Sequence, residues 1–334
     1  MFQPMRIHIY SRAFAPAVGG MERLMETLAS EFHRLGHKVV VVSETPGSVQ
    51  LPYSVVRRPG FLAYRKLASQ SDVILSAPLS LRRLLGQLLS GRRICVAHPL
   101  PFARSGRHGL SGRLKQIVCR LTVNIVPSRF LAQHLPDPVV IPNPFEGSLF
   151  TLPPSEGERA GVVFAGRQVP EKGCQLLLEA FAAAAPSARL TIIGDGPERG
   201  ALQACAARLG ILERVEFCGV LSGKALAAKI GAHRVMVVPS LWEEPFGIVA
   251  LEGLACGCRV IVANSGGLPE AVGALALTFP RGDRDALTRC LDQALGPDDC
   301  PPSGTDVAAH LAGFTPTRIA AQYLEVLHAA ALPR

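Results

Sequence analysis

The sequence predicts an α/β protein of two doubly wound domains, each a parallel sheet between helices, that face an interdomain cleft. Three observations support this prediction. Strand-like and helix-like segments alternate through the first half of the 334-residue chain, a stretch rich in proline and glycine interrupts them, and the alternation then begins again. Ligands of such sheets bind beyond the carboxyl ends of the strands, so we expect a site in the cleft.

Residues 1–144 carry the first alternation. The apolar residues 5–10 read as a strand, a helix is expected over residues 20–35, and four consecutive valines predict a strand at residues 39–43. Further strands are expected at residues 72–75, 93–96, 122–126 and 139–141. This alternation is typical of a parallel sheet with crossover helices.

A hinge is predicted at residues 145–158, where prolines and glycines are frequent. The second alternation, over residues 159–314, begins with the strand-like sequence GVVFAG. Its further strands are expected at residues 190–193, 215–217, 235–238 and 259–262. A last helix is expected over residues 316–332, and its periodicity leaves open where it packs.

Composition favours a cytoplasmic protein with two cores. Hydrophobic residues make up 48% of the chain. No stretch approaches the ~18 consecutive apolar residues of a membrane-spanning helix, and the N-terminus reads as a strand and not as a signal peptide. The nine cysteines lack paired metal-ligand spacing, since Cys256 and Cys258 are only two residues apart. We therefore expect reduced, mostly buried cysteines and no metal site.

The charge is distributed unevenly along the chain. Residues 1–150 hold 19 Lys and Arg against 7 Asp and Glu, whereas residues 151–334 hold 16 against 19. Between Arg57 and Arg129 there are 14 basic residues and one acidic residue, Asp72. This excess predicts an anionic partner for the first half. Aromatic residues amount to only 6% of the chain, so nucleic acid is not expected as that partner.

Two amphipathic segments lie in this basic half. The first carries apolar residues at helical spacing: Leu110, Leu114, Ile117, Val118 and Leu121. We interpret it as an acceptor region that faces a membrane, with packing against the core as the alternative. The basic residues assigned to this region are Arg104, Arg107, Arg113, Lys115 and Arg120. The second segment, the leucine-rich residues 81–89, is expected to face the core.

The segment 239–270, PSLWEEPFGIVALEGLACGCRVIVANSGGLPE, combines features of a ligand site. The sequence EPFG predicts that a loop enters a helix at Gly247, and the unpaired N–H groups of a helix start suit a phosphate. Glu244 precedes this junction and Glu252 follows it by about one and a half turns, so the carboxylates can bind hydroxyl groups on both sides of the phosphate. A nucleotide sugar has this chemistry, and the alternative is a capped helix with solvated acids.

Other candidate residues follow predicted strands. Gly19 and Gly20 open the first helix, either as a turn that approaches a ligand or as a structural turn. Arg167 and Lys172 follow the strand GVVFAG and could neutralise a diphosphate, with solvated surface cations as the alternative. His98 ends the strand ICVAH at a carboxyl edge, where it is either a ligand contact or a structural residue.

These motifs together resemble the retaining GT-B glycosyltransferases of the glycogen synthase and bacterial group 1 type. The matching sequences, in the order of that family, are GG, GR followed by PEKG, GDGP, EPFG within Glu-x7-Glu, and GGLPE. The resemblance covers nearly the whole chain and is densest from Gly161 to Glu270. One departure follows Asn143, where the chain reads PF and the family usually has Gly, Ile or Val, and Asp.

The resemblance implies the GT-B fold of two Rossmann-like domains and a nucleotide-sugar site. Arg167 and Lys172 would hold the donor diphosphate, Glu252 the ribose, and His98 would contact the donor sugar. The residues so assigned to the donor are Gly19, Gly20, Gly166, Arg167, Lys172, Glu244, Phe246, Gly247, Ile248 and Glu252. The catalytic residues would be Glu244, Arg167, Lys172 and His98. Residues 1–144 with a C-terminal helix over 315–334 would bind the acceptor, and residues 159–314 the donor.

The implied reaction moves a hexose from a UDP- or GDP-linked donor to a lipid-linked or cell-surface glycan, with retention and without a metal or cofactor. Arg167 and Lys172 would stabilise the departing diphosphate, whose phosphate would accept the proton of the acceptor hydroxyl on the same face. The enzyme would be cytoplasmic and peripheral on that side of the membrane. The alternatives are a nucleotide-sugar epimerase, which leaves the basic half without a purpose, and a non-catalytic nucleotide-sugar-binding protein.

Overall fold

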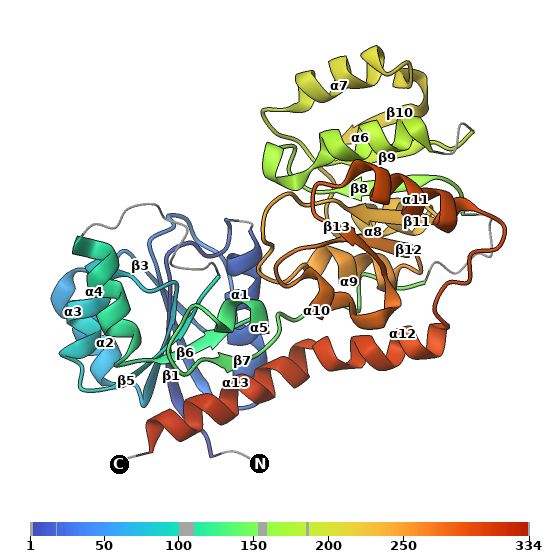
Figure 1. Ribbon diagram of the computed structural model, residues 1–334. Coiled ribbons are helices and arrows are strands. Elements are labelled where there is room, and N and C mark those ends of the chain that lie inside the picture. Colours follow the sequence, from blue (N-terminus) through green and yellow to red (C-terminus); the bar gives the residue numbers. More distant parts are fainter. Residues whose placement is uncertain (1–2, 18, 100–109, 153–158, 185–186, 333–334) are drawn as a thin grey trace. The chain divides into compact units, whose positions relative to one another are not determined.

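A computed structural model describes residues 3–17, 19–99, 110–152, 159–184 and 187–332 (Figure 1). The chain forms two compact units: unit 1 comprises Met1–Pro144 and Pro316–Arg334, and unit 2 comprises Phe145–Thr315. Each unit has one parallel sheet between helices, so the predicted α/β class is confirmed. No described helix is both long and apolar enough to cross a bilayer.

The sheet of unit 1 has seven strands in the order β3-β2-β1-β4-β5-β6-β7. All neighbouring strands are parallel, and the central strands β1 and β4 are buried along almost their whole length. Their valine and isoleucine content suits strands covered on both faces. The strands are β1 (Arg6–Ser11), β2 (Lys38–Ser43), β3 (Ser54–Arg57), β4 (Val73–Ala77), β5 (Arg93–Ala97), β6 (Val123–Val126) and β7 (Val139–Val140).

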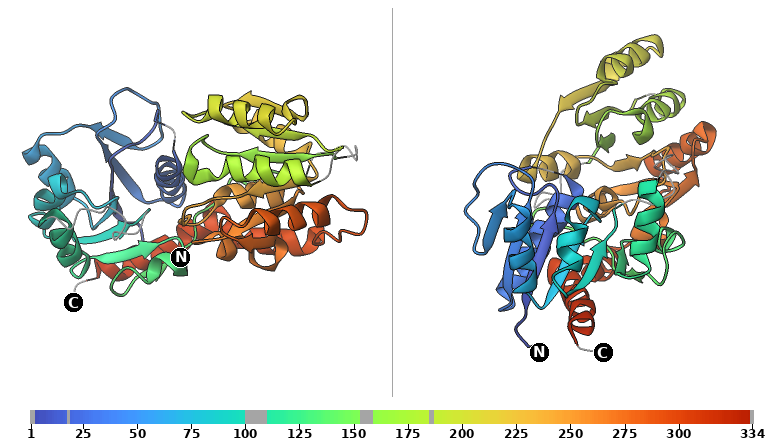
Figure 2. Two further views of the ribbon diagram at one scale, coloured as in Figure 1. Left: turned by 45° about the horizontal axis from the view of Figure 1, so that its top comes forward. Right: turned by 90° about the vertical axis from the view of Figure 1, so that its left-hand side faces the viewer.

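Two layers of helices cover the sheet of unit 1 (Figures 1 and 2). On one face α1 packs against α13, the last helix of the chain, with Leu28 and Leu327 fully buried. On the other face α2, α3 and α4 bury Ala68, Leu84 and Val118 against β4 and β5. The helices of unit 1 are α1 (Gly20–Arg34), α2 (Phe61–Ser69), α3 (Leu81–Leu88), α4 (Leu110–Cys119), α5 (Arg129–Ala132) and α13 (Pro316–Ala331).

The prediction that the leucines of α3 face the core is wrong for most of them. Leu84 is buried, but Leu85, Leu88 and Leu89 are 58%, 49% and 50% exposed. Polar side chains occupy the inner side of the helix instead. Gln87 donates to the Tyr64 hydroxyl at 2.9 Å, and Arg83 pairs with Glu44 at 2.6 Å. Helical spacing alone did not show which side of α3 packs inward.

The sheet of unit 2 has six parallel strands in the order β10-β9-β8-β11-β12-β13. The chain runs outward from β8 to β10 and then from β11 to β13, so right-handed crossovers place helices on both faces. The strands are β8 (Val162–Ala165), β9 (Leu190–Ile193), β10 (Val215–Gly219), β11 (Val235–Val238), β12 (Arg259–Asn264) and β13 (Leu277–Pro280).

The helices of unit 2 form two groups by their contacts. In one group α6 packs against α7 and α11, and in the other α9 packs against α8, α10 and α12. Phe145 and Phe150, which lie where the sequence predicts a hinge, are buried in the core of unit 2. The helices are α6 (Cys174–Ala183), α7 (Arg199–Arg208), α8 (Gly223–Gly231), α9 (Ile248–Ala255), α10 (Leu268–Val272), α11 (Arg284–Leu295) and α12 (Gly304–Leu311).

The cysteines fit the expectation of reduced thiols. All nine are unpaired, and six of them are buried. Cys258 is 4% exposed, and burial raises the pKa of its thiol to about 12. Of the other three cysteines, Cys218 and Cys290 are partly buried and Cys300 is exposed.

Candidate functional site

The candidate site lies at one edge of the sheet of unit 2. Strands β8, β9, β11 and β12 are parallel, so the loops that follow them all leave the sheet at the same edge. These loops hold most of the residues assigned from the sequence. Arg167 and Lys172 follow β8, Glu244 follows β11, and Gly266 follows β12. The topology therefore brings residues as far apart in sequence as Arg167 and Gly266 to one end of four neighbouring strands.

Glycines let three of these loops touch through their backbones. Gly173 has φ +70°, and a Cβ there would overlap the carbonyl oxygen of Pro239 in the loop after β11. Gly266 has φ +61°, and a Cβ there would overlap the backbone of Glu244. Gly267 also donates its N–H to the Glu244 carbonyl at 2.7 Å. Glu244 is thus held from both neighbouring loops.

Gln168 joins the loops after β8 and β9. Its backbone N–H donates to the Asp195 carbonyl at 2.9 Å, and its Nε2 donates to the Gly194 carbonyl at 2.8 Å. Its own carbonyl accepts the N–H of Glu198 at 3.1 Å. The side chain is fully buried. These bonds fix the GDGP turn against the residues that follow β8.

Lys172 and Glu244 form an ion pair at the centre of this edge. The Nζ of Lys172 lies 2.6 Å from Oε1 of Glu244, and Ser240 Oγ donates to the same carboxylate oxygen at 2.6 Å. Glu244 is 7% exposed and Ser240 is 1% exposed. A carboxylate buried to this extent depends on its partners, because an unpaired buried charge is costly. Glu244 is therefore not a solvated surface acid.

Trp242 lies beside this pair and was not singled out from the sequence. Lys172 Nζ sits 5.5 Å from the centre of its ring, within cation–π distance. Its carbonyl accepts the Ser265 hydroxyl at 3.1 Å. It is the only tryptophan of the chain. Its position two residues before Glu244 could have indicated from the sequence that it belongs to the site. No sequence feature indicated that Ser240 or Gln168 belongs to the site.

The helix α9 begins where the sequence predicts a loop-to-helix junction. Gly247 is its N-cap residue, with φ +112°, and Ile248 is its first residue. The side chain of Phe246 packs 5.6 Å from Phe314 in the core, so only its backbone can serve a ligand. Glu252 is 8% exposed on the same helix. The structure thus places two buried carboxylates on either side of a helix start.

The two predicted cations differ in their surroundings. Lys172 is partly buried in its ion pair, whereas Arg167 is exposed just after Gly166 at the end of β8. Such an exposed guanidinium at the carboxyl edge can bind a phosphate in a bidentate manner. Lys172 can do so only if its contact with Glu244 rearranges. At this edge Arg167 is therefore accessible to an anion, whereas Lys172 is already paired with Glu244.

The remaining predicted residues belong to unit 1. Gly19 is the N-cap of α1 in extended backbone, and Gly20 begins that helix. Lys115 and Arg120 lie on or just after α4. The side chain of Arg113 is not described, and Arg104 and Arg107 lie outside the described residues.

His98 follows β5 and is almost fully buried, with 3% exposure. Its Nε2 lies 3.0 Å from Oδ1 of Asn124, and its backbone N–H donates to Ile125 at 2.9 Å. Burial lowers the pKa of its ring to about 4, and the bond to Asn124 opposes this shift only in part. The imidazole is therefore neutral at neutral pH.

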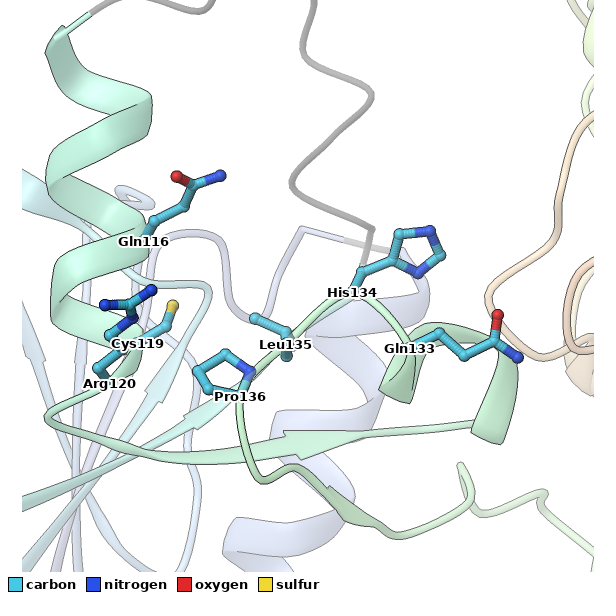
Figure 3. Close-up of a pocket in the computed structure, with 7 residues that line it drawn as sticks. All are labelled: Gln116, Cys119, Arg120, Gln133, His134, Leu135 and Pro136. Atoms are coloured by element: carbon cyan, nitrogen blue, oxygen red, sulfur yellow. The ribbon is translucent and has the colours of Figure 1, made fainter.

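A cavity of about 380 Å³ opens in unit 1 between α4 and the segment that follows α5 (Figure 3). Gln116 and Arg120 line it from the side of α4, and Gln133 and His134 from the other side. Asn124 donates to the Cys119 and Pro136 carbonyls, at 2.7 and 3.0 Å, and so ties the two walls together. No carboxylate lines the cavity in the described part of the chain.

The described residues contain no group of three His, Cys, Asp or Glu side chains placed to hold a metal ion. At the edge of unit 2 the polar groups are cations, carboxylates and backbone N–H groups. This set suits an anionic ligand that also carries hydroxyl groups.

Comparisons with known proteins agree with this chemistry. Residues 153–298, which include the whole candidate site of unit 2, match the model of the family "Glycosyl transferases group 1". One relative is the GDP-mannose-dependent alpha-(1-6)-phosphatidylinositol monomannoside mannosyltransferase of Mycolicibacterium smegmatis, which is 28% identical over 84% of this chain and 87% of its own. Another is the 2-deoxystreptamine N-acetyl-D-glucosaminyltransferase of Streptomyces fradiae, 33% identical over 62% of this chain and 51% of its own.

Solved structures show the fold. HepE of Anabaena, in complex with UDP and glucose, has a TM-score of 0.78 at 20% identity and covers 97% of this chain and 100% of its own. Sucrose-phosphate synthase of Thermosynechococcus elongatus has a TM-score of 0.79 at 20% identity, over 97% of this chain and 98% of its own. Residues 153–298 therefore carry the group 1 glycosyltransferase similarity, and the fold of the chain is GT-B.

Proposed function

We propose that this protein moves a hexose from a UDP- or GDP-linked donor to a lipid-linked or cell-surface glycan, with retention and without a divalent metal. The observation that carries the proposal is the Lys172–Glu244 pair, 2.6 Å apart, at the start of α9. The pair supports the proposal because a cation and a buried carboxylate lie together, and a nucleotide sugar needs both groups at the step from diphosphate to hexose. Neither an inert surface nor a simple phosphate site needs a buried carboxylate at this point.

In the proposed complex each group at the edge has one task. Arg167 and Lys172 bind the diphosphate together with the N–H groups at Phe246, Gly247 and Ile248. Glu244 accepts hydroxyl protons from the hexose, and Glu252 does the same for the ribose. Gly166 lets the diphosphate approach the end of β8.

The proposed reaction takes place on one face of the sugar. The bond between the anomeric carbon and the diphosphate oxygen breaks, and the acceptor oxygen bonds to the same carbon from the same side. The hydroxyl proton of the acceptor passes to the departing phosphate oxygen, so no protein base is required. Negative charge grows on the diphosphate, and each well-placed cation or N–H there contributes about 3 to 4 kcal/mol to the transition state.

The relatives support this donor and acceptor chemistry. The Mycolicibacterium smegmatis relative is named for GDP-mannose and for a phosphatidylinositol mannoside acceptor. The relative of Mycobacteroides abscessus is named for D-inositol 3-phosphate, and it is 43% identical over 33% of this chain. Both names describe acceptors that carry phosphate and hydroxyl groups. Such an acceptor suits the basic unit 1, which we propose as the acceptor-binding domain.

The test uses Trp242, the only tryptophan, as a reporter of the donor. UDP-, GDP- and ADP-sugars are titrated into the full-length protein while its fluorescence is recorded. One donor should change the emission saturably, because a phosphate that draws Lys172 away from the ring alters the surroundings of Trp242. The same donor is then supplied with acceptor lipids, and the anomeric configuration of the product is determined by NMR.

Lys172→Ala should weaken the fluorescence response and lower turnover by about 100-fold or more. Lys229→Ala is the matched control, because Lys229 pairs with Glu216 at 2.7 Å in the same unit but at an exposed site. That variant should behave like the wild type. Binding without any turnover would favour a non-catalytic sugar-nucleotide protein, and a changed sugar with no transfer would favour an epimerase.

A further inference from the structure

Exposed apolar side chains are concentrated on one layer of helices in unit 1. Among the described residues, fifteen large hydrophobic side chains are exposed, and eight of them lie on or directly after α2, α3 and α4. We call this group the α2–α3–α4 face. Its members are Phe61, Leu62, Leu85, Leu88, Leu89, Leu114, Ile117 and Leu121.

These eight side chains lie on the outer side of the layer. The inner sides of the three helices share one core, in which Ala68, Leu84 and Val118 pack against strands β4 and β5. The helices α2 and α3 also pack directly on each other. Figures 1 and 2 show the three helices together on the same side of the unit 1 sheet. Their outward sides therefore point away from the same sheet face.

In α3 most of the leucines face outward and two polar side chains face the core, so core packing does not explain why these leucines are exposed. Leu85, Leu88 and Leu89 follow the three- and four-residue spacing of one helix side. That side is about half exposed, while polar Arg83 and Gln87 fill the inner side. Grouped apolar surface of this kind marks a docking site, because soluble proteins rarely leave it in contact with water.

The charges around the face are almost all positive. Arg65, Lys66, Arg82 and Arg120 are exposed on or next to the same helices. The only acidic residue between Arg57 and Arg129 is Asp72, whose carboxylate accepts the backbone N–H of Arg6 at 2.7 Å. Apolar side chains surrounded mainly by cations match the surface of an anionic bilayer.

We propose that the α2–α3–α4 face docks on an anionic lipid bilayer. The leucines, Ile117 and Phe61 enter the region between headgroups and acyl chains, and the cations lie among the headgroups. The cavity beside α4 adds Arg120, His134 and two amides, which can bind a lipid phosphate. The docking extends over three helices, beyond the segment 104–120 that the sequence suggested. The docking proposal rests on the proposed function in one respect: docking would bring the active site to a lipid-linked acceptor.

The experiment is sedimentation of the full-length protein with vesicles. Vesicles of phosphatidylcholine alone are compared with vesicles that also contain phosphatidylglycerol, at low and at high salt. The wild type should sediment with the anionic vesicles, less so at high salt, and remain in solution with the neutral ones. The double variant Leu85→Glu, Leu89→Glu should bind the anionic vesicles at least about tenfold more weakly, because it loses apolar contact and adds repulsion.

The matched control is Leu35→Glu with Leu212→Glu. These leucines are 42% and 41% exposed, but they lie outside the face, at the end of α1 and in unit 2. The control has the same charge as the test variant and should bind like the wild type. Circular dichroism confirms that both variants fold, and donor titration of Trp242 confirms that unit 2 is intact.

Three outcomes overturn the proposal. The wild type fails to sediment with anionic vesicles, the control variant loses as much binding as the test variant, or the test variant binds vesicles normally and instead dissociates a dimer of the wild type. The last outcome would identify a second copy of the chain as the occupant. If the protein binds vesicles but transfers no sugar, the docking proposal is supported and the proposed function is contradicted.

Discussion

At the scale of single residues, the surroundings of Glu244 bear on the proposed retaining mechanism. Its Oε1 accepts hydrogen bonds from Lys172 and Ser240, both at 2.6 Å. A carboxylate held in this way is well placed to bind hydroxyl groups. It is a poor nucleophile, because its charge is already shared with a cation and a hydroxyl.

Glu244→Gln therefore tests the mechanism. The amide oxygen can still accept from Ser240, but the charge that strengthens the hydrogen bonds to the sugar is lost. We expect kcat/KM to fall by roughly 10- to 100-fold, which corresponds to the loss of one charge-assisted hydrogen bond. Turnover is measured by release of the nucleoside diphosphate. Glu243→Gln, the neighbouring residue, whose partner Arg281 lies 3.5 Å away at a partly exposed site, should keep most of the activity.

Intact mass spectrometry of the Glu244 variant with donor present completes this test. If the departing phosphate accepts the proton, no covalent sugar accumulates on the protein in either variant. A glycosylated protein species would show that a side chain attacks the anomeric carbon, and the same-face mechanism would then be wrong.

At the scale of elements, the site depends on how closely the loops of unit 2 approach one another. Gly266 leaves no room for a side chain above the Glu244 backbone and has a left-handed φ of +61°. An alanine there costs roughly 1 to 2 kcal/mol from its backbone conformation alone, before the clash is counted. Because the clash pushes on Glu244, we expect Gly266→Ala to lower both the free energy of unfolding and the affinity for the donor.

Urea unfolding followed by Trp242 fluorescence measures the first effect, and donor titration measures the second. Gly200→Ala serves as the control, since Gly200 lies in α7 and a Cβ there meets no atom within 4 Å. An alanine in a helix should leave stability unchanged or raise it by up to about 1 kcal/mol. Equal losses in both variants would mean that the contact of Gly266 with Glu244 has no special importance.

The sequence predicted the central strands of both sheets but only two of the four edge strands, β7 and β10. Strands such as 190–193 and 235–238 were located to the residue, because they are short, mostly apolar segments buried on both faces. The edge strands β3 and β13 were not expected. They are short, partly exposed strands, and β13 ends in a proline. With one unpaired edge each, they need less apolar sequence than a central strand does.

The sequence named candidate residues of the site but not the contacts between them. The motifs indicated Lys172 and Glu244, but not that the two form an ion pair before any ligand is present. Ser240, Gln168 and the orientation of Trp242 depend on contacts between loops that are distant in sequence. A single sequence contains no direct signal for such contacts. The burial of both carboxylates was likewise visible only in the structure.

At the scale of the whole molecule, the two units differ in their charge, and unit 1 contains the two histidines whose pKa is lowered most. Unit 1 contains His8 in strand β1 and His98 after β5, and the pKa of each ring is lowered to about 4, mainly by burial. The coulombic effect of Arg83 lowers the pKa of His8 further. Neither ring nitrogen of His8 has a hydrogen-bond partner among the described residues. Tyr64 packs edge-on against that ring at 5.2 Å.

These histidines should make unit 1 sensitive to mild acid. An unfolded histidine takes up a proton below its ordinary pKa of about 6.5, whereas the folded rings stay neutral down to about pH 4. Between these values the unfolded state binds more protons, so the free energy of unfolding decreases as the pH falls. For His8 the loss over this range amounts to about 3 kcal/mol, and above pH 6.5 it vanishes.

His8→Leu should remove this share of the pH dependence. At pH 7 the variant should be at least as stable as the wild type, because leucine leaves no unpaired nitrogen in the core. Between pH 6.5 and 4.5 its free energy of unfolding should decrease less steeply. Far-UV circular dichroism in urea follows both units, and Trp242 fluorescence, which reports only unit 2, should show the same transition in variant and wild type. His33→Leu, at an exposed position of α1, should keep the wild-type slope, and an unchanged slope in His8→Leu would show that His8 is not the group that titrates.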